Sequence, residues 1–338
     1  MTSRIAETGI WQDQREASAS VGATLEQHRE FAEAAALLTG PGIRRVVATG
    51  NGASYYVAHA LWLAALLAPG PGPELVAVPG GLVARGAFPW REGDAFLAIS
   101  SSGEFRDLVE AIEGSPAPKV AVTAHPASTI GRAAQVVVPV TVSSQRAITH
   151  TQAFLGAVAA CLAVWAEIRD DVSMREDLAH VPDVLRETTE AALGWAEQVF
   201  SPDEALPPAA IAFGSGPAWA GALEAALLVK EIARIPCEGS ETREAVTAAM
   251  TAVLPGHLVL ALPTRADPLA EEALDVFERL GARVLRVPGG ERASAPLAAI
   301  STFAAALAAS VALALRGGHD PDRPAWVEAY YETARVSR

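Results

Sequence analysis

The feature that most constrains the fold is a strand–glycine–helix module that occurs twice in the chain. The first copy reads RRVVATGNGASYYVAHALWLAALL and contains Gly50 and Gly52. The second copy reads PAAIAFGSGPAWAGALEAALLVKEI, with Gly214 and Gly216 at the matching places. A buried strand that turns through glycines into a helix presents backbone N–H groups that favour anions, phosphate above all. Repetition of the whole module predicts two related domains, each with a ligand-facing end.

Short apolar strands alternate with helical stretches in both halves of the chain, which predicts an α/β fold with parallel sheets covered by helices on both faces. We expect strands at 46–49, 75–78, 95–99, 120–123 and 136–140, and then at 210–213, 258–262 and 283–287. The predicted organisation is an N-terminal helical segment at 1–40, a first domain with a connecting helix at 41–200, a second domain at 201–316 and a tail at 317–338.

Composition excludes several classes of function. The net charge is −13 and no basic stripe is visible, so nucleic acid is not an expected partner. The apolar stretches 60–68 and 302–315 are shorter than the ~20 residues of a membrane span, and the N-terminus lacks a signal-like segment. We therefore expect a cytoplasmic protein without a membrane partner. Cys161 and Cys237 lie in apolar or helical contexts, and neither a metal nor a cofactor is expected.

Residues 100–104 read SSSGE and separate an apolar strand from an amphipathic helical pattern. Hydroxyls and backbone amides that meet at a helix N-terminus attract a dianion. A simple serine N-cap is the alternative interpretation. Three consecutive serines and a glycine exceed what capping needs, so we predict a ligand loop, and Ser54 in the first glycine loop is placed to approach the same anion.

Five motifs follow one another along the chain, and their order is informative: NGASY at 51–55, ISSSGE at 99–104, ITHTQAF at 148–154, ALEAALLVKEI at 222–232 and HDPDRP at 319–324. Together they resemble the double sugar-isomerase (SIS) domain family, which includes the isomerase half of glucosamine-6-phosphate synthase and stand-alone phosphosugar isomerases and deaminases. The resemblance covers nearly the whole chain. It implies two tandem SIS domains of flavodoxin-like, three-layer αβα architecture, a sugar phosphate as ligand, and a homodimer. The apolar helical stretches 151–165 and 298–315 favour a homodimer as well.

The resemblance also implies substrate contacts. Three serines match the phosphate-binding hydroxyls of the family, and Ser101 stands where the synthase has a glutamine. The stretch that begins at Ile148 matches the backbone that contacts the sugar. The predicted substrate-binding residues are Gly52, Ala53, Ser54, Ser100, Ser101, Ser102, Ile148, Thr149 and Thr151. Phe105 replaces a threonine that helps hold the phosphate, which favours a substrate other than an ordinary hexose 6-phosphate.

For catalysis, Glu231 matches the glutamate that shuttles a proton between the first two sugar carbons. Glu224 lies seven residues earlier on the predicted helix 218–235 and shares its face. Two carboxylates in an apolar stripe are costly to bury without a purpose. The alternative is a surface glutamate or an ion pair of Glu231 with Arg234 or Arg243.

Three positions depart from the family. Thr247 stands where the family has its ring-opening histidine, so His150 and His319 are the candidates for opening the ring or polarising a carbonyl. Leu228 and Ala329 stand where the family has lysines. The remaining lysines, at positions 119 and 230, are not placed to form an imine, so amino transfer of the synthase type is not expected. Without an N-terminal glutaminase domain, glutamine is not expected to supply ammonia within this chain.

The sequence therefore predicts an enzyme that acts on a sugar phosphate or amino-sugar phosphate. The reaction would be aldose–ketose isomerisation, or deamination or deglycation, through an enediol or enolamine. Two alternatives stay open. One is a non-catalytic phosphosugar sensor, favoured by the missing histidine and lysine, and the other is a diverted enzyme with an atypical substrate.

Overall fold

The computed structural model describes residues 2–68, 70–86, 88–201, 204–265 and 267–334. They form two compact units that interleave along the chain. Unit 1 comprises Met1–Glu16, Ser144–Thr151 and Asp183–Pro324, and unit 2 comprises Ala17–Ser143, Gln152–Pro182 and Ala325–Arg338. The units therefore differ from the contiguous domains expected at 41–200 and 201–316. The N-terminal segment is divided between the two units, and the last four residues of the predicted tail lie outside the described residues.

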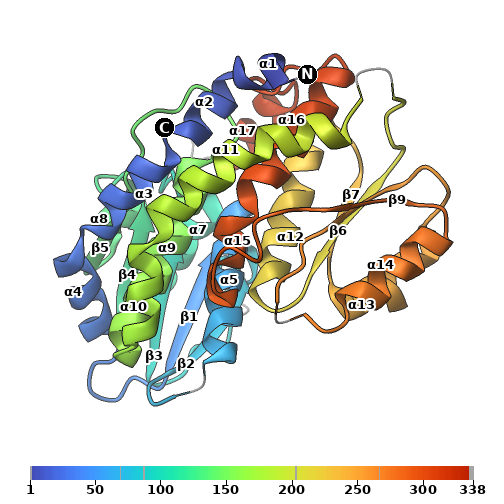
Figure 1. The fold of residues 1–338 in the computed structure, drawn as a ribbon. Coiled ribbons are helices and arrows are strands. Elements are labelled where there is room, and N and C mark those ends of the chain that lie inside the picture. The colour runs from blue at the N-terminus through green and yellow to red at the C-terminus, as the bar shows by residue number, and fades with distance from the viewer. Residues whose placement is uncertain (1, 69, 87, 202–203, 266, 335–338) are drawn as a thin grey trace. The chain divides into compact units, whose positions relative to one another are not determined.

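Unit 2 is built on a five-stranded parallel sheet with the order β2-β1-β3-β4-β5 (Figure 1). Its strands are β1 (Arg45–Gly50), β2 (Glu74–Pro79), β3 (Asp94–Ile99), β4 (Lys119–Thr123) and β5 (Val136–Pro139). All five expected strands are present within about one residue of the predicted bounds. Near-continuous apolar runs such as β3, which is buried along its whole length, are typical of parallel strands covered on both faces. The strand order is the flavodoxin-like one, as predicted.

Helices cover both faces of this sheet. Those of unit 2 are α3 (Ala17–Leu25), α4 (His28–Leu38), α5 (Ala53–Leu67), α6 (Gly80–Ala84), α7 (Arg106–Gly114), α8 (Thr129–Ala133), α9 (Gln152–Arg169), α10 (Val172–Ala179) and α17 (Val327–Ala334). On one face, Phe96 of β3 packs in a buried cluster with Leu108 and Ile112 of α7. The helices α5 and α4 pack against the central helix α9.

Unit 1 carries a second parallel sheet with the order β7-β6-β8-β9. Its strands are β6 (Ala210–Gly214), β7 (Cys237–Glu241), β8 (Leu258–Ala261) and β9 (Arg283–Arg286). Strand β7 is absent from the sequence prediction because it reads CEGSE, without an apolar run. Only Cys237 and Ser240 are buried in it. The segment forms a strand because its backbone pairs with β6, which its composition does not indicate.

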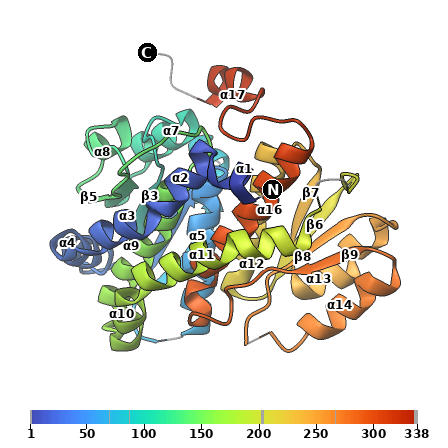
Figure 2. The same ribbon diagram turned by 45° about the horizontal axis from the view of Figure 1, so that its top comes forward.

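Helices lie on both sides of this sheet too (Figure 2). They are α1 (Thr2–Ala6), α2 (Gly9–Arg15), α11 (Val181–Val199), α12 (Pro217–Leu228), α13 (Thr242–Thr247), α14 (Ala270–Arg279), α15 (Ala298–Ser301) and α16 (Phe303–Arg316), with the shorter turns η1 (Val229–Ala233), η2 (Ala249–Ala252) and η3 (Ala295–Leu297). Phe213 of β6 stacks on Phe277 of α14, with ring centroids 5.7 Å apart. On the other side, α12 packs against β6, β7 and α16.

Two helical stretches, Gln152–Arg169 and Ala295–Arg316, are long and apolar enough to cross a membrane, judged by length and composition only. The second is longer than the expected stretch 302–315 because η3 and α15 continue into α16. However, 83% and 100% of their most apolar windows are buried within the described chain, as in core helices of a soluble fold. This burial also removes the sequence argument for a homodimer, because the apolar faces are already covered.

Candidate functional site

In unit 2, the predicted anion loops follow two neighbouring strands. β1 pairs in parallel with β3, with Thr49 opposite Ala98, so residues 51–54 and 100–103 emerge side by side at the carboxyl edge of the sheet. β1 is also the strand at which the order of the sheet reverses, since β2 lies on its other side. Ligands of open α/β sheets bind in the crevice at such a reversal.

The first glycine loop turns directly into α5. A Cβ on Gly50 would lie 2.5 Å from the backbone carbon of Ser54, so the close approach of strand and helix requires glycine. Gly52 is the N-cap, with φ +55°, and no side chain caps the helix. The partial positive charge of the first turn is therefore not neutralised by a capping side chain. Ala53 and Ser54 are the first two residues of α5, and both are half-buried.

The serine loop is held by its own hydrogen bonds. Ser100 Oγ accepts from Gly103 N at 3.0 Å, and Ser102 Oγ accepts from Glu104 N at 3.3 Å. These two amides, which the sequence analysis expected to reach an anion, are thus used within the loop. A hydroxyl that accepts in this way can still donate its proton, so these bonds leave the O–H groups of Ser100 and Ser102 able to donate to a ligand. The carbonyl of Ser101 accepts from Ala124 N at 3.1 Å, which ties the loop to the end of β4.

The two residues after this loop contact other parts of unit 2. The Glu104 carboxylate accepts from the backbone N–H and the hydroxyl of Thr129, at 2.9 and 2.8 Å. The ring of Phe105 lies 6.3 Å from that of Tyr330 in α17. The aromatic side chain that replaces the family's threonine therefore packs against the C-terminal helix, and the tail contacts its own unit.

In unit 1, Glu231 lies in a π-helical turn. The predicted continuous helix 218–235 is wrong beyond Leu228, where α12 gives way to the π-helix η1. Such turns replace the i→i+4 bonding pattern locally and are frequent at functional sites. Burial raises the pKa of Glu231 from 4.5 to about 7, while a hydrogen bond from Thr149 and the charge of Lys230 oppose the rise. Arg243, one of the predicted ion-pair partners, lies 3.7 Å from Glu272 instead.

Glu224 lies one and a half turns of α12 before η1, and only 2% of it is exposed. Its Oε2 is buried and has no hydrogen-bond partner among the described residues. Burial raises the pKa of Glu224 well above its ordinary value, and the charge of Glu231 raises it further. Burial thus favours the protonated, neutral form of Glu224, which is electrostatically coupled to Glu231.

The loop 144–151 brings a second group of predicted residues to unit 1. Thr149 is buried and donates its hydroxyl to Glu231 Oε2 at 3.1 Å. The amide of Ile148 donates to the carbonyl of Asp322 at 3.0 Å. The hydroxyl of Thr151 is buried and, within the described part of the chain, accepts or donates no hydrogen bond.

Neither of the two candidate histidines takes part in the hydrogen bond between Thr149 and Glu231. The His150 ring lies 3.4 Å from the side-chain amide of Gln145. The side chain of His319 is exposed, and its backbone N–H donates to Ala314 O at 2.9 Å. Neither is among the groups that shift the pKa of Glu231. The structure thus groups Thr149, Glu231 and Glu224 in unit 1, and the glycine and serine loops in unit 2.

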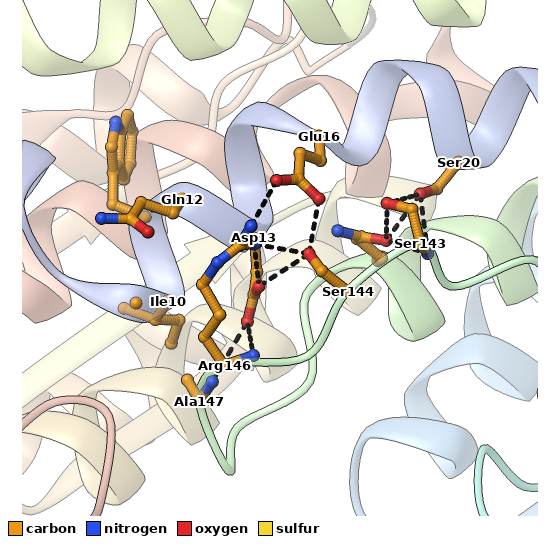
Figure 3. Close-up of polar contacts among 12 residues, drawn as sticks. Ile10, Gln12, Asp13, Glu16, Ser20, Ser143, Ser144, Arg146 and Ala147 are labelled. Carbon is orange, nitrogen blue, oxygen red and sulfur yellow. Dashed lines mark hydrogen bonds and ion pairs between the residues drawn. The ribbon is translucent and has the colours of Figure 1, made fainter.

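A cluster that the sequence analysis missed supports the loop 144–151 (Figure 3). The buried carboxylate of Asp13 in α2 binds the loop at Arg146 and Ala147, and Asp322 binds the start of α2. Asp322 belongs to the motif HDPDRP, which was a usable signal. Asp13 stands in a helical stretch without any motif, so nothing in the sequence singled it out.

No family model matches this chain. Among curated proteins, it is 26% identical over 262 residues to glutamine–fructose-6-phosphate aminotransferase (isomerizing) from Zymomonas mobilis, a match that covers 71% of this chain. The chain spans about two fifths of the length of that relative, 41%.

Solved structures show the same fold at low identity. Glucosamine-6-phosphate deaminase from Thermotoga maritima is 19% identical, with a TM-score of 0.73 over 92% of this chain and 97% of that one. Tagatose-6-phosphate ketose/aldose isomerase from Escherichia coli is 19% identical, with a TM-score of 0.75 over 93% of this chain and 95% of that one. The predicted resemblance to the tandem SIS proteins and the predicted α/β fold are confirmed.

Proposed function

We propose that the protein is an enzyme that binds a sugar phosphate or amino-sugar phosphate and moves a proton between its first two carbons. One observation carries this proposal: a carboxylate, Glu231, whose pKa of about 7 makes it both a competent base and a competent acid at neutral pH. The serine hydroxyls of unit 2 support it, because they supply donors for the phosphate beside the uncapped start of α5.

In the proposed reaction, Glu231 in its ionised form takes the carbon-bound proton next to the carbonyl, which gives an enediol or, from an amino sugar, an enolamine. The same carboxyl group returns the proton to the neighbouring carbon. Thr149 favours the ionised form through its hydrogen bond, while burial favours the protonated form. The two effects together keep both forms populated, as a shuttle requires.

Isomerisation and deamination share this proton transfer and differ in whether ammonia leaves. The solved relatives with this fold include one of each kind by name. Amino transfer is not part of the proposal, because Leu228 and Ala329 stand where the family's lysines are expected.

The test is incubation of the protein with fructose 6-phosphate and, separately, glucosamine 6-phosphate in deuterium oxide. We expect solvent deuterium at carbon 1 or 2 by NMR, and ammonia release only if the protein is a deaminase. Glu231→Gln should lower the exchange rate by ~10²- to 10⁴-fold. The matched control is Glu238→Gln, an exposed carboxylate of the adjacent strand β7, which should leave exchange unchanged. Exchange that survives Glu231→Gln would contradict the assignment.

A second candidate is an enzyme that acts on an atypical substrate, and the packing of Phe105 against Tyr330 favours it. In that case no hexose 6-phosphate should raise the melting temperature. Binding of a phosphosugar without deuterium exchange would instead support a sensor. We further propose a homodimer in the cytoplasm that binds neither nucleic acid nor membrane. The homodimer now depends on the family resemblance alone, and light scattering of the purified protein tests it.

A further inference from the structure

The loop that carries Thr149 is held by carboxylates from two distant parts of unit 1. Asp13 belongs to α2 near the start of the chain, and Asp322 follows α16 near its end. Neither residue was a candidate for a role in the site. Each makes several hydrogen bonds with the loop or with the helix that supports it.

Asp13 binds the loop backbone directly. Its Oδ2 accepts from the amides of Arg146 and Ala147, at 2.7 and 3.1 Å. Its Oδ1 accepts from the Arg146 guanidinium at 2.8 Å and from the Ser144 hydroxyl at 3.0 Å. The side chain of Asp13 is only 3% exposed, so these bonds form out of water, where charged hydrogen bonds fix geometry most strongly. Figure 3 shows this carboxylate turned toward the loop.

Glu16, one turn further along α2, offers an instructive contrast. Its carboxylate binds the Arg146 guanidinium at 2.6 Å and the Ser144 hydroxyl at 2.5 Å. Both of these contacts are with side chains of the loop, and the side chain of Glu16 is 38% exposed. Asp13 therefore binds the loop backbone, whereas these two contacts of Glu16 hold side chains at the solvent edge of the cluster.

Asp322 joins the same helix to the same loop. Its carboxylate accepts from the amides of Gly9 and Ile10 at the first turn of α2, both at 2.7 Å. Its backbone carbonyl accepts from the amide of Ile148 at 3.0 Å. Asp322 thus fixes α2, which carries Asp13, and also fixes the loop residue directly before Thr149.

The contacts of Asp13 and Asp322 together form a clamp on the loop, and the clamped loop carries the residue that binds Glu231. Thr149 follows the clamped residues by one to three positions and donates to Glu231 Oε2 at 3.1 Å. A hydrogen bond to a carboxylate has the right strength only when donor and acceptor are held within a few tenths of an ångström. We propose that Asp13 and Asp322 are positioning residues, which hold the loop so that the Thr149 hydroxyl remains hydrogen-bonded to the carboxylate of Glu231. Its importance for turnover rests on the function proposed above.

Other charged groups of unit 1 lie near Glu231. Lys230 precedes it, Glu224 is coupled to it from α12, and the packed helix α16 contributes one charged residue, Arg316, which binds Glu204. None of these groups contacts Asp13 or Asp322 in the bonds described above. A change in the ionisation of Glu231 after substitution of Asp13 would therefore report the position of Thr149.

The experiment is a carboxyl ¹³C NMR titration of the protein labelled at the side-chain carboxyl of glutamate, without substrate, with the Glu231 signal assigned by its absence in Glu231→Gln. Thr149→Val should raise the pKa of Glu231 by about one pH unit, the value of one hydrogen bond to a charged group. Thr149→Ser keeps the hydroxyl and should leave the pKa near that of the wild type. Asp13→Asn and Asp322→Asn should each raise it by roughly half a unit or more, on the same reasoning.

Two comparisons decide the outcome. Asp13→Asn combined with Thr149→Val should raise the pKa no further than Thr149→Val alone, because both act through one hydrogen bond. Glu16→Gln, the matched control, should leave the pKa unchanged. An unchanged pKa in Asp13→Asn, or fully additive shifts in the double variant, would overturn the inference.

Two controls distinguish a failure of this inference from a failure of the variant to fold and from a failure of the proposed function. Each variant is first checked for a cooperative melt, and if Asp13→Asn lacks one, Asp13→Glu and Asp322→Asn are titrated instead. The titration needs no substrate. Coupled shifts in a protein that exchanges no deuterium would therefore support the clamp and contradict the proposed function, and deuterium exchange without coupled shifts would do the reverse.

Discussion

The two glycine-loop modules have nearly the same backbone and different chemistry. Gly52 and Gly216 share φ +55°, with ψ −130° and −139°, and each is the N-cap of the following helix. In both modules the preceding glycine allows the strand to meet the helix: a Cβ on Gly50 or Gly214 would lie 2.5 or 2.8 Å from backbone atoms of that helix. The strand order around each module is also the same.

The side chains around the two loops differ. Where the first module has Ser54, the second has Ala218, and the hydroxyl of Ser215 donates to the chain's own Glu241 at 3.2 Å. An internal carboxylate thus accepts a hydrogen bond from the hydroxyl of the second module, and the expected ligand-facing end of that module stays a prediction. The helix of the second module instead carries Glu224 and Glu231 near its far end. Under the proposed function, the duplicated backbone therefore serves anion binding in one copy and acid–base chemistry in the other.

The largest effect is expected from removing hydroxyls of the first module. Ser54→Ala combined with Ser102→Ala should weaken phosphosugar binding by ~100-fold. Each substitution removes a serine hydroxyl, and with it a charge-assisted hydrogen bond to the phosphate dianion. Ser215→Ala is the matched change in the second module and should leave affinity unchanged. Isothermal titration calorimetry measures both. Equal losses in the two modules would erase the proposed division of roles.

The second prediction concerns the carboxyl group of the second module and the pH dependence of stability. Because the pKa of Glu231 is about 7 in the folded protein and near 4.5 unfolded, the folded state binds the proton more tightly. Glu231 therefore stabilises the fold below pH 4.5, and this contribution falls as the pH rises to 7, by at most about 3 kcal/mol. Glu231→Gln should make the decline smaller by that amount, as measured by urea unfolding between pH 5 and 8, whereas the contribution of buried Glu224 remains. A decline of the same size in the variant would contradict the assignment.

The glycines that precede the helices test the similarity of the modules rather than their difference. Gly50→Ala and Gly214→Ala each force a Cβ against backbone atoms, and each should lower the free energy of unfolding by about 1–3 kcal/mol. Chemical denaturation measures both values. A loss at Gly50 alone would show that the second module tolerates a wider turn and that the two copies are less alike than their dihedral angles indicate.

The smallest effect is expected at Glu241. Its carboxylate accepts from the amides of Arg243 and Glu244 as the N-cap of α13. Glu241→Gln should therefore cost about 1 kcal/mol of stability, the usual value of such a cap. Inorganic phosphate should not bind the variant more tightly than it binds the wild type. A new phosphate site in Glu241→Gln would show that this carboxylate masks an anion site in the second module.

Sequence patterns predicted the sheet cores because buried parallel strands are apolar along their length, as in β3. They missed β7, whose residues CEGSE carry no such pattern and become a strand only by pairing with β6. The seven-residue spacing predicted Glu224 and Glu231 on one α-helical face, yet the π-helical turn at Val229–Ala233 changes the geometry of that face. The serine loop was predicted at the correct edge, although two of its amides bind its own hydroxyls.

The sequence by itself determined the duplicated α/β architecture and the hydroxyl-rich loop, because strand burial, glycine turns and local hydroxyls are written in neighbouring residues. Only the tertiary structure decided how Glu231 ionises. Its pKa depends on removal from water and on Thr149, which lies 82 positions earlier in the chain. The tertiary structure also brings Asp13 to the loop that carries Thr149 and Asp322 to the helix that carries Asp13, since groups so far apart in sequence meet only when the whole unit folds.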